Sequence, residues 1–305
     1  DEWAHRVNML MLERHGQRIN RRNAQDIFTP LYNHQIPPGA AQVVHYRLAI
    51  PPDIKDPVEL SVRLRYRKFD FEYMSLVLGG EDKVPKLPIV DLCEDSVVLP
   101  VEGGAIRVPD QQSPIKPAWQ RWNDYGIGCY LEGGPDEKKG ELRQAEQAFR
   151  VLTGPEAPKE AHAHGYLNMA RVQIDEGRLN EAVQSLRKAK ECDPPPPWWT
   201  LTWFNTLVSL ENAGSSKDFD EAIANLERIL DPANQPRDRK FDFSRDYVVI
   251  DALGRALFRR SQLEADEAIR NAFLEQAITR YESALKLDPE NLDAHYGLFQ
   301  CLQLL

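Results

Sequence analysis

The chain has 305 residues, a formal net charge of −9 and 42% hydrophobic residues, as expected for a globular chain of about two domains. The acidic balance argues against a nucleic-acid-binding protein, which would need a basic face. No stretch approaches the roughly 18 uninterrupted apolar residues of a membrane span. The chain starts at Asp1 rather than Met, which would fit the removal of a leader or of a longer N-terminal part.

Residues 1–37 have the weakest pattern, and we expect an irregular N-terminal arm there. Trp3, Val7, Leu10 and Leu12 have the spacing of a short helix, which His15-Gly16 would end.

Residues 38–112 favour a small antiparallel β module. Apolar and polar residues alternate over residues 43–50 and again over residues 58–66, and this alternation is typical of half-buried strands. We expect these two strands to pair antiparallel, with further short strands at residues 76–78, 87–92 and 96–101. The economical architecture is a small antiparallel sheet or sandwich, with the apolar residues of 58–66 turned inward.

An arginine row lies on the outward face of the second strand. Arg63, Arg65 and Arg67, with Arg47 nearby, could bind an anion or an acidic partner, because guanidinium groups match carboxylates. Alternatively, the row is a solvated face or pairs with local Glu and Asp residues.

The remainder of the chain, residues 117–305, repeats one helical pattern. A small residue is followed four places later by a large apolar one and three places later by another small or apolar one, so all three share a helix face, and Pro follows. A partner helix with an aromatic or large apolar residue precedes each copy. The repeated second-helix residues are Ala145/Phe149/Leu152, Ala182/Leu186/Ala189, Ala222/Leu226/Ile229 and Ala277/Tyr281/Ala284; the first-helix residues are Trp122/Gly126/Cys129, Tyr166/Ala170/Gln173, Trp203/Leu207/Leu210 and Ile250/Gly254/Leu257.

This skeleton resembles the tetratricopeptide repeat family, whose 34-residue unit is a helix-turn-helix. The copy at about residues 163–196 fits without a gap, with Gly177 in the turn. We expect insertions in the other copies around residues 133–140, 215–218 and 261–271. The resemblance implies a helical solenoid of about four repeats, and a last single helix at residues 292–302 begins a fifth.

The N-terminal part shows a second resemblance, to the region after the haem-binding part of secreted bacterial multihaem c-type cytochromes that end in tetratricopeptide repeats. This resemblance implies a periplasmic or extracellular location beside electron-transfer proteins. The chain itself lacks a C-x-x-C-H motif, so we expect no covalent haem. The runs that are similar are QRINRRNAQDIF at 17–28, YNHQIPPGAA at 32–41, HYRL at 45–48, LRYRKF at 64–69 and LPIV at 87–90.

The sequence offers no recognised chemistry. No nucleophile, phosphate-loop or zinc-protease motif is present, so we expect no catalytic residue. Cys129, Cys192 and Cys301 read as packing residues. His162-x-His164 lacks an evident third ligand, and we assign no metal and no cofactor. His5, His15 and His34 read as surface or turn histidines, although imidazoles there could also serve as axial ligands to a partner's haem.

The inner groove of the solenoid is the favoured binding surface, because first helices line the concave face of such arrays. Aromatic and arginine side chains next to the packing positions are the types enriched at binding hot spots. The candidate groove residues are Tyr130, His164, Arg171, Phe204, Asp251, Arg255 and Arg259.

We therefore predict an α+β protein, a small antiparallel β module followed by an all-α tetratricopeptide-like solenoid, with a non-enzymatic scaffolding function. The expected partner is a multihaem cytochrome or further copies of the same chain, outside the cytoplasm. The alternatives are a peptide-binding adaptor without a redox partner and an enzyme with an unrecognised site.

Overall fold

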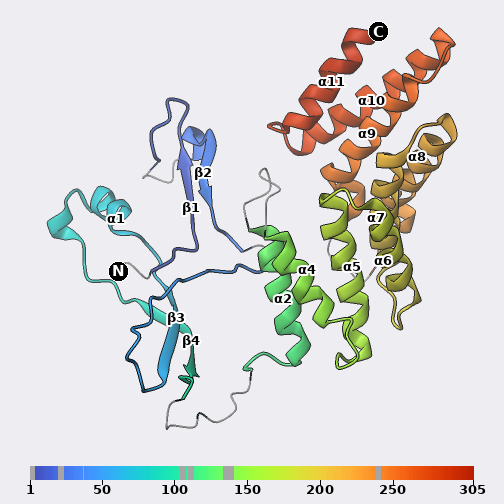
Figure 1. Ribbon diagram of the computed structural model, residues 1–305. Helices are drawn as coiled ribbons and strands as arrows, with labels where there is room; N and C mark the ends of the chain where they lie inside the picture. Colours follow the sequence, from blue (N-terminus) through green and yellow to red (C-terminus); the bar gives the residue numbers. More distant parts are fainter. Residues whose placement is uncertain are drawn as a thin grey trace. The chain divides into compact units, whose positions relative to one another are not determined.

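The computed structural model describes residues 4–19, 24–36, 38–103, 108, 113–132, 141–237 and 242–305. The chain divides into two compact units, Asp1–Glu141 and Leu142–Leu305. The described part of the first unit contains two small antiparallel sheets, and the second unit is a succession of helices (Figure 1). The presence of both small antiparallel sheets and a helical region confirms the α+β class predicted from the sequence.

The N-terminal arm contains a β ladder where we expected a helix. Strand β1 (Met9–Leu12) pairs antiparallel with β2 (Thr29–Asn33), and its register shifts between Leu10 and Met11. The turn between the two strands includes Gly16, whose φ of 79° lies in the left-handed region that favours glycine. The helix that we expected from the apolar spacing is therefore wrong for residues 9–12. These residues form a short strand, whose backbone groups form hydrogen bonds with β2.

The β module is built on one long ladder. Strand β3 (Val58–Tyr66) pairs antiparallel with β4 (Val90–Leu99), with a bulge between Leu64 and Arg65. The segment at residues 43–50, which we expected to pair with β3, has no regular secondary structure, so that prediction was wrong. Strand β3 pairs with β4 instead, because β4 places valines and two carboxylates opposite the apolar residues and the arginines of β3.

Other details of the β module also differ from the sequence prediction. Residues 76–78 belong to helix α1 (Phe71–Leu78), which Asp70 caps at the N-terminus and Gly79, with a φ of 74°, caps at the C-terminus. The expected strands at 87–92 and 96–101 are the single strand β4. Each described sheet has only two strands, and Val62 and Leu64 are 64% and 46% exposed, so neither a sandwich nor an inward apolar face is present in the described residues.

Helix α2 (Ala118–Leu131) is the last helix of the first unit in the described residues. The extended segment before β3 approaches it very closely, because a Cβ added to Gly128 would lie 2.6 Å from Val43 Cγ2 and 3.2 Å from the Val43 backbone nitrogen. Glycine at position 128 therefore permits this contact between a helix and a backbone segment.

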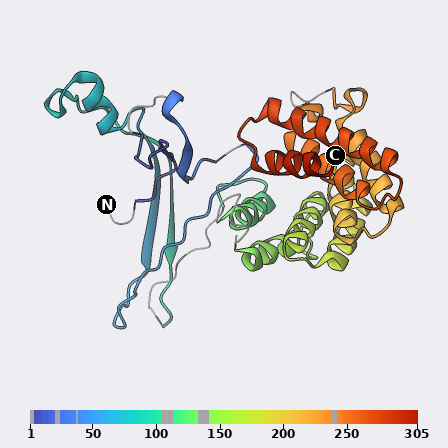
Figure 2. The ribbon, with the colours of Figure 1, turned by 90° about the horizontal axis from the view of Figure 1, so that it is seen from above.

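The second unit is formed by helices that pack against their neighbours in the chain, and Figure 2 shows them following one another along a curved path. Short turns join the helices within each pair, so that the pairs are antiparallel hairpins. The helices are α4 (Leu142–Val151), α5 (Lys159–Asp175), α6 (Leu179–Glu191), α7 (Trp198–Asn212), α8 (Ser216–Leu230), α9 (Tyr247–Ser261), α10 (Glu267–Leu287) and α11 (Leu292–Leu304).

The repeated packing positions are buried as the periodicity predicted. All twelve second-helix residues of the four copies are buried, and Ala182 and Ala277, for example, are completely inaccessible. In the first helices, Ala170, Leu257 and Cys129 are also buried, whereas Trp122 is 45% exposed. Small residues at these positions let the helix backbones approach, and the large ones fill the space between them.

Two of the predicted insertions are not loops. Residues 215–218 are the start of α8, where Ser215 and Asp218 form a reciprocal capping box. The segment at 261–271 is a short turn followed by the first residues of α10, which begins after the cap Asp266. At residues 261–271 the extra residues thus lengthen α10, because the Asp266 carboxylate caps this helix at an early position. The third predicted insertion, residues 133–140, lies outside the described residues.

Candidate functional site

The candidate binding face lies on the first helices of the repeats, which are in contact with one another along the second unit. Helix α5 contacts α7, and α9 contacts α11. Helix α9 is also tied to α7, since Arg259 Nη1 donates a 2.9 Å hydrogen bond to the carbonyl oxygen of Leu210. The first helices therefore form a continuous row.

Two predicted binding residues, Arg171 on α5 and Phe204 on α7, meet in this row. The Arg171 guanidinium lies over the Phe204 ring, 6.0 Å from its centroid, which is a cation–π distance. Arg171 Nη1 also donates a 3.1 Å hydrogen bond to Asn168 Oδ1, one turn earlier on α5. Both side chains are half-buried, so each presents part of its surface to solvent in a fixed orientation.

The other three arginine and aspartate candidates share one face of α9, because Asp251, Arg255 and Arg259 are spaced four residues apart. Their environments differ. Arg259 is half-buried and its guanidinium stacks 4.9 Å from the Phe219 ring centroid, so it contributes to packing between helices. Arg255 is exposed. Arg255 is therefore the residue of the three that is most available to a partner.

Asp251 is buried near the contact between α9 and α11. Desolvation raises the pKa of its carboxyl group; the nearby Arg255 acts in the opposite direction, and Asp293 of α11 adds to the rise. Its Oδ1 atom is buried and has no hydrogen-bond partner. Such a carboxylate is costly to keep ionised, and it is too deep for direct contact with a partner.

The remaining helical candidates are less closely connected. His164 on α5 is exposed, although the surrounding side chains partly desolvate its imidazole and lower its pKa. Tyr130 is half-buried on α2, in the first unit. The arrangement of α5, α7 and α9 thus brings together Arg171 and Phe204, and it places Arg255 and Arg259 on the neighbouring helix.

The arginine row of the β module mainly pairs within its own ladder. Arg63 Nε lies 3.2 Å from Glu94 Oε2, and Arg65 Nε lies 3.0 Å from Asp91 Oδ1. Arg67, beyond the end of β3, lines a shallow hollow with Phe71 and Met74. Pairing with local acidic residues was one of the two readings of this row, and exposed pairs of this kind stabilise a sheet by about 0–1 kcal/mol.

The sequence reasoning missed a cluster in the first unit. The side chains of His45, Cys129 and Glu141 present ligand atoms within 4.8 Å of one another. Cys129 was expected to serve packing alone, and it is indeed buried. Because His45 lies far from Cys129 and Glu141 in the sequence, no spacing motif could have indicated that the three residues meet.

The described residues form small β ladders followed by paired helical repeats. Comparison with known families makes the repeats more specific: residues 163–196 match the model described as tetratricopeptide repeat, and residues 274–298 match a model described as TPR repeat. The chain thus contains tetratricopeptide repeats, which indicates a scaffold for protein–protein interaction and a typically non-catalytic module. No curated protein and no solved structure matches the chain.

A membrane-spanning helix is absent from the described ranges, because no helix there is long and apolar enough to cross a bilayer.

Proposed function

We propose that the protein is a non-enzymatic scaffold that binds a partner protein along its first helices α5, α7 and α9, which would form the inner face of a repeat solenoid. The observation that carries this proposal is the contact between Arg171 and Phe204 on successive first helices. A cation fixed over a half-exposed aromatic ring is a ready-made contact point, because little side-chain freedom remains to be lost on binding.

The chemistry of this face favours a partner segment with both acidic and apolar side chains. Arg171 and the exposed Arg255 can pair with carboxylates, and Phe204 can accept an apolar side chain. This local basic character contrasts with the net charge of −9 of the whole chain. A complementary acidic segment would therefore recognise this face in preference to the rest of the surface.

The partner that we propose is a multihaem cytochrome, or further copies of the chain, in a periplasmic or extracellular setting. The support is the resemblance of the N-terminal runs, together with one geometric feature. His34 Nδ1 lies 3.1 Å from His5 Nε2, the two rings are stacked, and Gln42 Nε2 lies 2.9 Å from His34 Nδ1. Desolvation, with a smaller contribution from His5, lowers the pKa of His34. A lower pKa favours the neutral imidazole, which is the form that can serve as an axial ligand to a partner's haem.

The experiment is copurification of the full chain from its source, followed by size exclusion with absorbance and light scattering. A Soret band that elutes with the wild-type chain, and that is lost in the double variant Arg171→Ala/Phe204→Ala, would support a cytochrome bound at this face. The control is Arg187→Ala, an exposed arginine on the second helix α6, which should bind as the wild type does.

Other outcomes separate the alternatives. A colourless homo-oligomer that the double variant converts to a monomer would support self-assembly at the same face. A colourless monomer would reject both partners and leave a peptide-binding adaptor as the better account. Retention of the partner by the double variant would show that the binding face lies elsewhere.

A further inference from the structure

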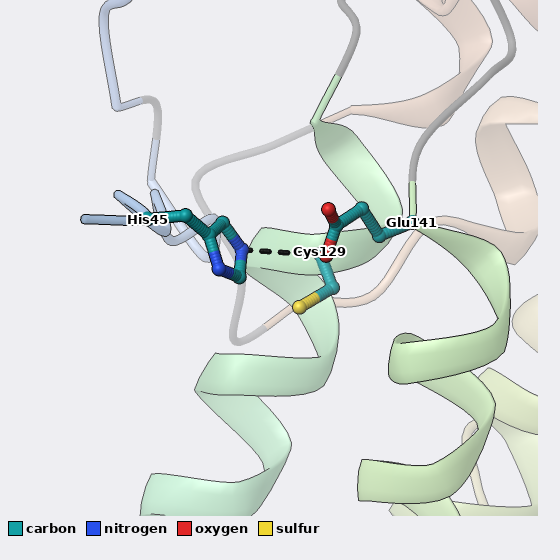
Figure 3. A group of neighbouring side chains, drawn as sticks. All are labelled: His45, Cys129 and Glu141. Carbon is teal, nitrogen blue, oxygen red and sulfur yellow. Dashed lines mark ion pairs between the residues drawn. The ribbon is translucent and has the colours of Figure 1, made fainter. Parts of the chain in front are cut away.

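The first unit gathers a histidine, a cysteine and two glutamates at one place, and nothing in the repeat-based function makes use of them. His45 lies in the extended segment before β3, and Cys129 lies on α2. Glu132 is the C-cap residue of α2, and Glu141 is the last residue of the first unit. Figure 3 shows the His45 ring pointing toward Cys129 and Glu141. His45 Nε2 lies 3.3 Å from Glu141 Oε2 and 3.5 Å from Glu132 Oε2.

The fold holds these groups in place through backbone packing. Because Gly128 lets Val43 lie directly against α2, the chain delivers His45, two residues later, next to the following helix residue, Cys129. Cys129 is completely buried, so its thiol has little freedom to move. Tyr125, one turn earlier on α2, hydrogen-bonds to the Cys129 thiol and fixes its direction further. Hydrogen bonds of this kind orient the ligands of metal sites.

The charges of the cluster are not balanced by the described residues. The Oε2 atoms of Glu132 and Glu141 are both buried and have no hydrogen-bond donor. In the described part of the chain, His45 is the one basic side chain that forms an ion pair with them. Buried carboxylate oxygens without donors are costly unless a cation satisfies them.

We propose that His45, Cys129 and Glu141 bind a Zn²⁺ ion, with Glu132 as the fourth ligand. One imidazole, one thiolate and carboxylate oxygens are the ligand types of zinc, whereas Ca²⁺ and Mg²⁺ prefer oxygen alone. Bond lengths of about 2.0–2.3 Å place the ligand atoms of a tetrahedral site about 3.3–3.8 Å apart. The ligand atoms of His45, Cys129 and Glu141 already lie within 4.8 Å of one another, and Glu132 Oε2 lies 3.5 Å from His45 Nε2, so small side-chain movements would give this geometry.

Four protein ligands leave no open coordination position, so the site is structural rather than catalytic. The ion would join the extended segment at His45 to α2 and to Glu141, and its binding would release the thiol proton of Cys129. The inference is independent of the proposed partner binding, because no residue of the α5, α7 and α9 face takes part.

The test is a titration of the full chain, first treated with a chelator, with Co²⁺ as a spectroscopic probe for Zn²⁺. We expect one equivalent of Co²⁺ to give the intense visible bands of four-coordinate cobalt and a near-ultraviolet thiolate-to-cobalt band, both removed by one equivalent of Zn²⁺. His45→Ala and Glu141→Gln should weaken binding at least tenfold, and Cys129→Ser should abolish the thiolate band.

Since Cys129 is buried and its substitution could disturb folding, the decisive variant is His45→Ala, whose side chain is 46% exposed. The matched controls are Cys93→Ser, an exposed thiol on β4, and His15→Ala, an exposed histidine of the arm; both should bind Co²⁺ as the wild type does. Zn²⁺ should also raise the Tm of the wild type but not that of His45→Ala. Absence of the thiolate band from the wild type, or equal affinity of His45→Ala, would overturn the proposal.

Discussion

The ring of Tyr281 on α10 packs directly on the backbone of Gly297 on α11, so closely that a Cβ at position 297 would overlap the ring atom Cζ. The same ring contacts Gly254 on α9, where a Cβ would lie 2.8 Å from Cε1. Tyr281 is 3% exposed. One aromatic side chain therefore joins three helices at the C-terminal part of the second unit, and the two glycines make the space that it fills.

This contact predicts that Gly297→Ala destabilises the protein even though alanine favours helices. Overpacking in a core costs about 1–3 kcal/mol, more than the gain of about 1 kcal/mol in helix propensity. Urea unfolding should show a lower midpoint for Gly297→Ala. The control is Gly214→Ala, where a Cβ meets nothing within 4 Å, and which should leave the midpoint nearly unchanged. Equal midpoints for Gly297→Ala and the wild type would show that Tyr281 can move aside.

A buried polar pair between α5 and α6 gives a second prediction. Ser185 Oγ donates a 2.8 Å hydrogen bond to Gln173 Oε1, and both residues are buried. Ser185→Ala should lower the free energy of unfolding by about 1–3 kcal/mol, because the Gln173 oxygen loses its donor away from water. Ser209→Ala, at an exposed position on α7, is the matched control and should have little effect. Similar free energies for the two variants would contradict the role given to this bond.

The second unit was predictable from the sequence because its contacts are local and repeated. The spacing of Ala182 and Leu186 places them on one helix face, and the same spacing recurs, so each copy supports the assignment of the others. The capping box of Ser215 and Asp218 is an ordinary helix-start signal too, although we expected a loop there. Helix α1 was also predictable, since Asp70 and Gly79 are ordinary start and stop signals, but we expected a strand at residues 76–78.

The first unit was less predictable because its contacts join distant segments. Alternation at residues 43–50 indicates two faces but does not specify a partner strand, and β3 pairs with β4 instead. The same limitation applies to the His45, Cys129 and Glu141 cluster, since each residue is unremarkable in its own segment. The close packing of Val43 on Gly128 brings His45 next to Cys129.

The buried Asp251 predicts an unusual dependence of stability on pH. Because burial raises its pKa in the folded state, the unfolded state releases this proton first as pH rises from about 4, the ordinary value for Asp. Its contribution to stability is therefore present at acidic pH and is lost as pH rises through the folded-state pKa. The variant Asp251→Asn has no such proton. Its free energy of unfolding, relative to that of the wild type, should therefore be higher at pH 7 than at pH 3.

The measurement is the free energy of unfolding of both proteins across this pH range. Asp53→Asn, which removes an exposed carboxylate in the first unit, is the control and should follow the wild-type curve. A stability difference between Asp251→Asn and the wild type that does not change with pH would mean that Asp251 acts through contacts rather than through its proton.

Arg259 provides a test that separates a structural from a binding role on the candidate face. Its guanidinium donates to the Leu210 carbonyl at 2.9 Å and stacks on Phe219, so Arg259→Ala should lower the free energy of unfolding by about 1–2 kcal/mol. Arg187→Ala on α6, where the arginine is exposed, should change it by less than about 0.5 kcal/mol. Arg259→Lys keeps the charge but loses the planar fork, so we expect an intermediate loss. If Arg259→Ala left the unfolding midpoint unchanged while it weakened partner binding, Arg259 would belong to the binding surface with Arg171 and Phe204 rather than to the packing between α7 and α9.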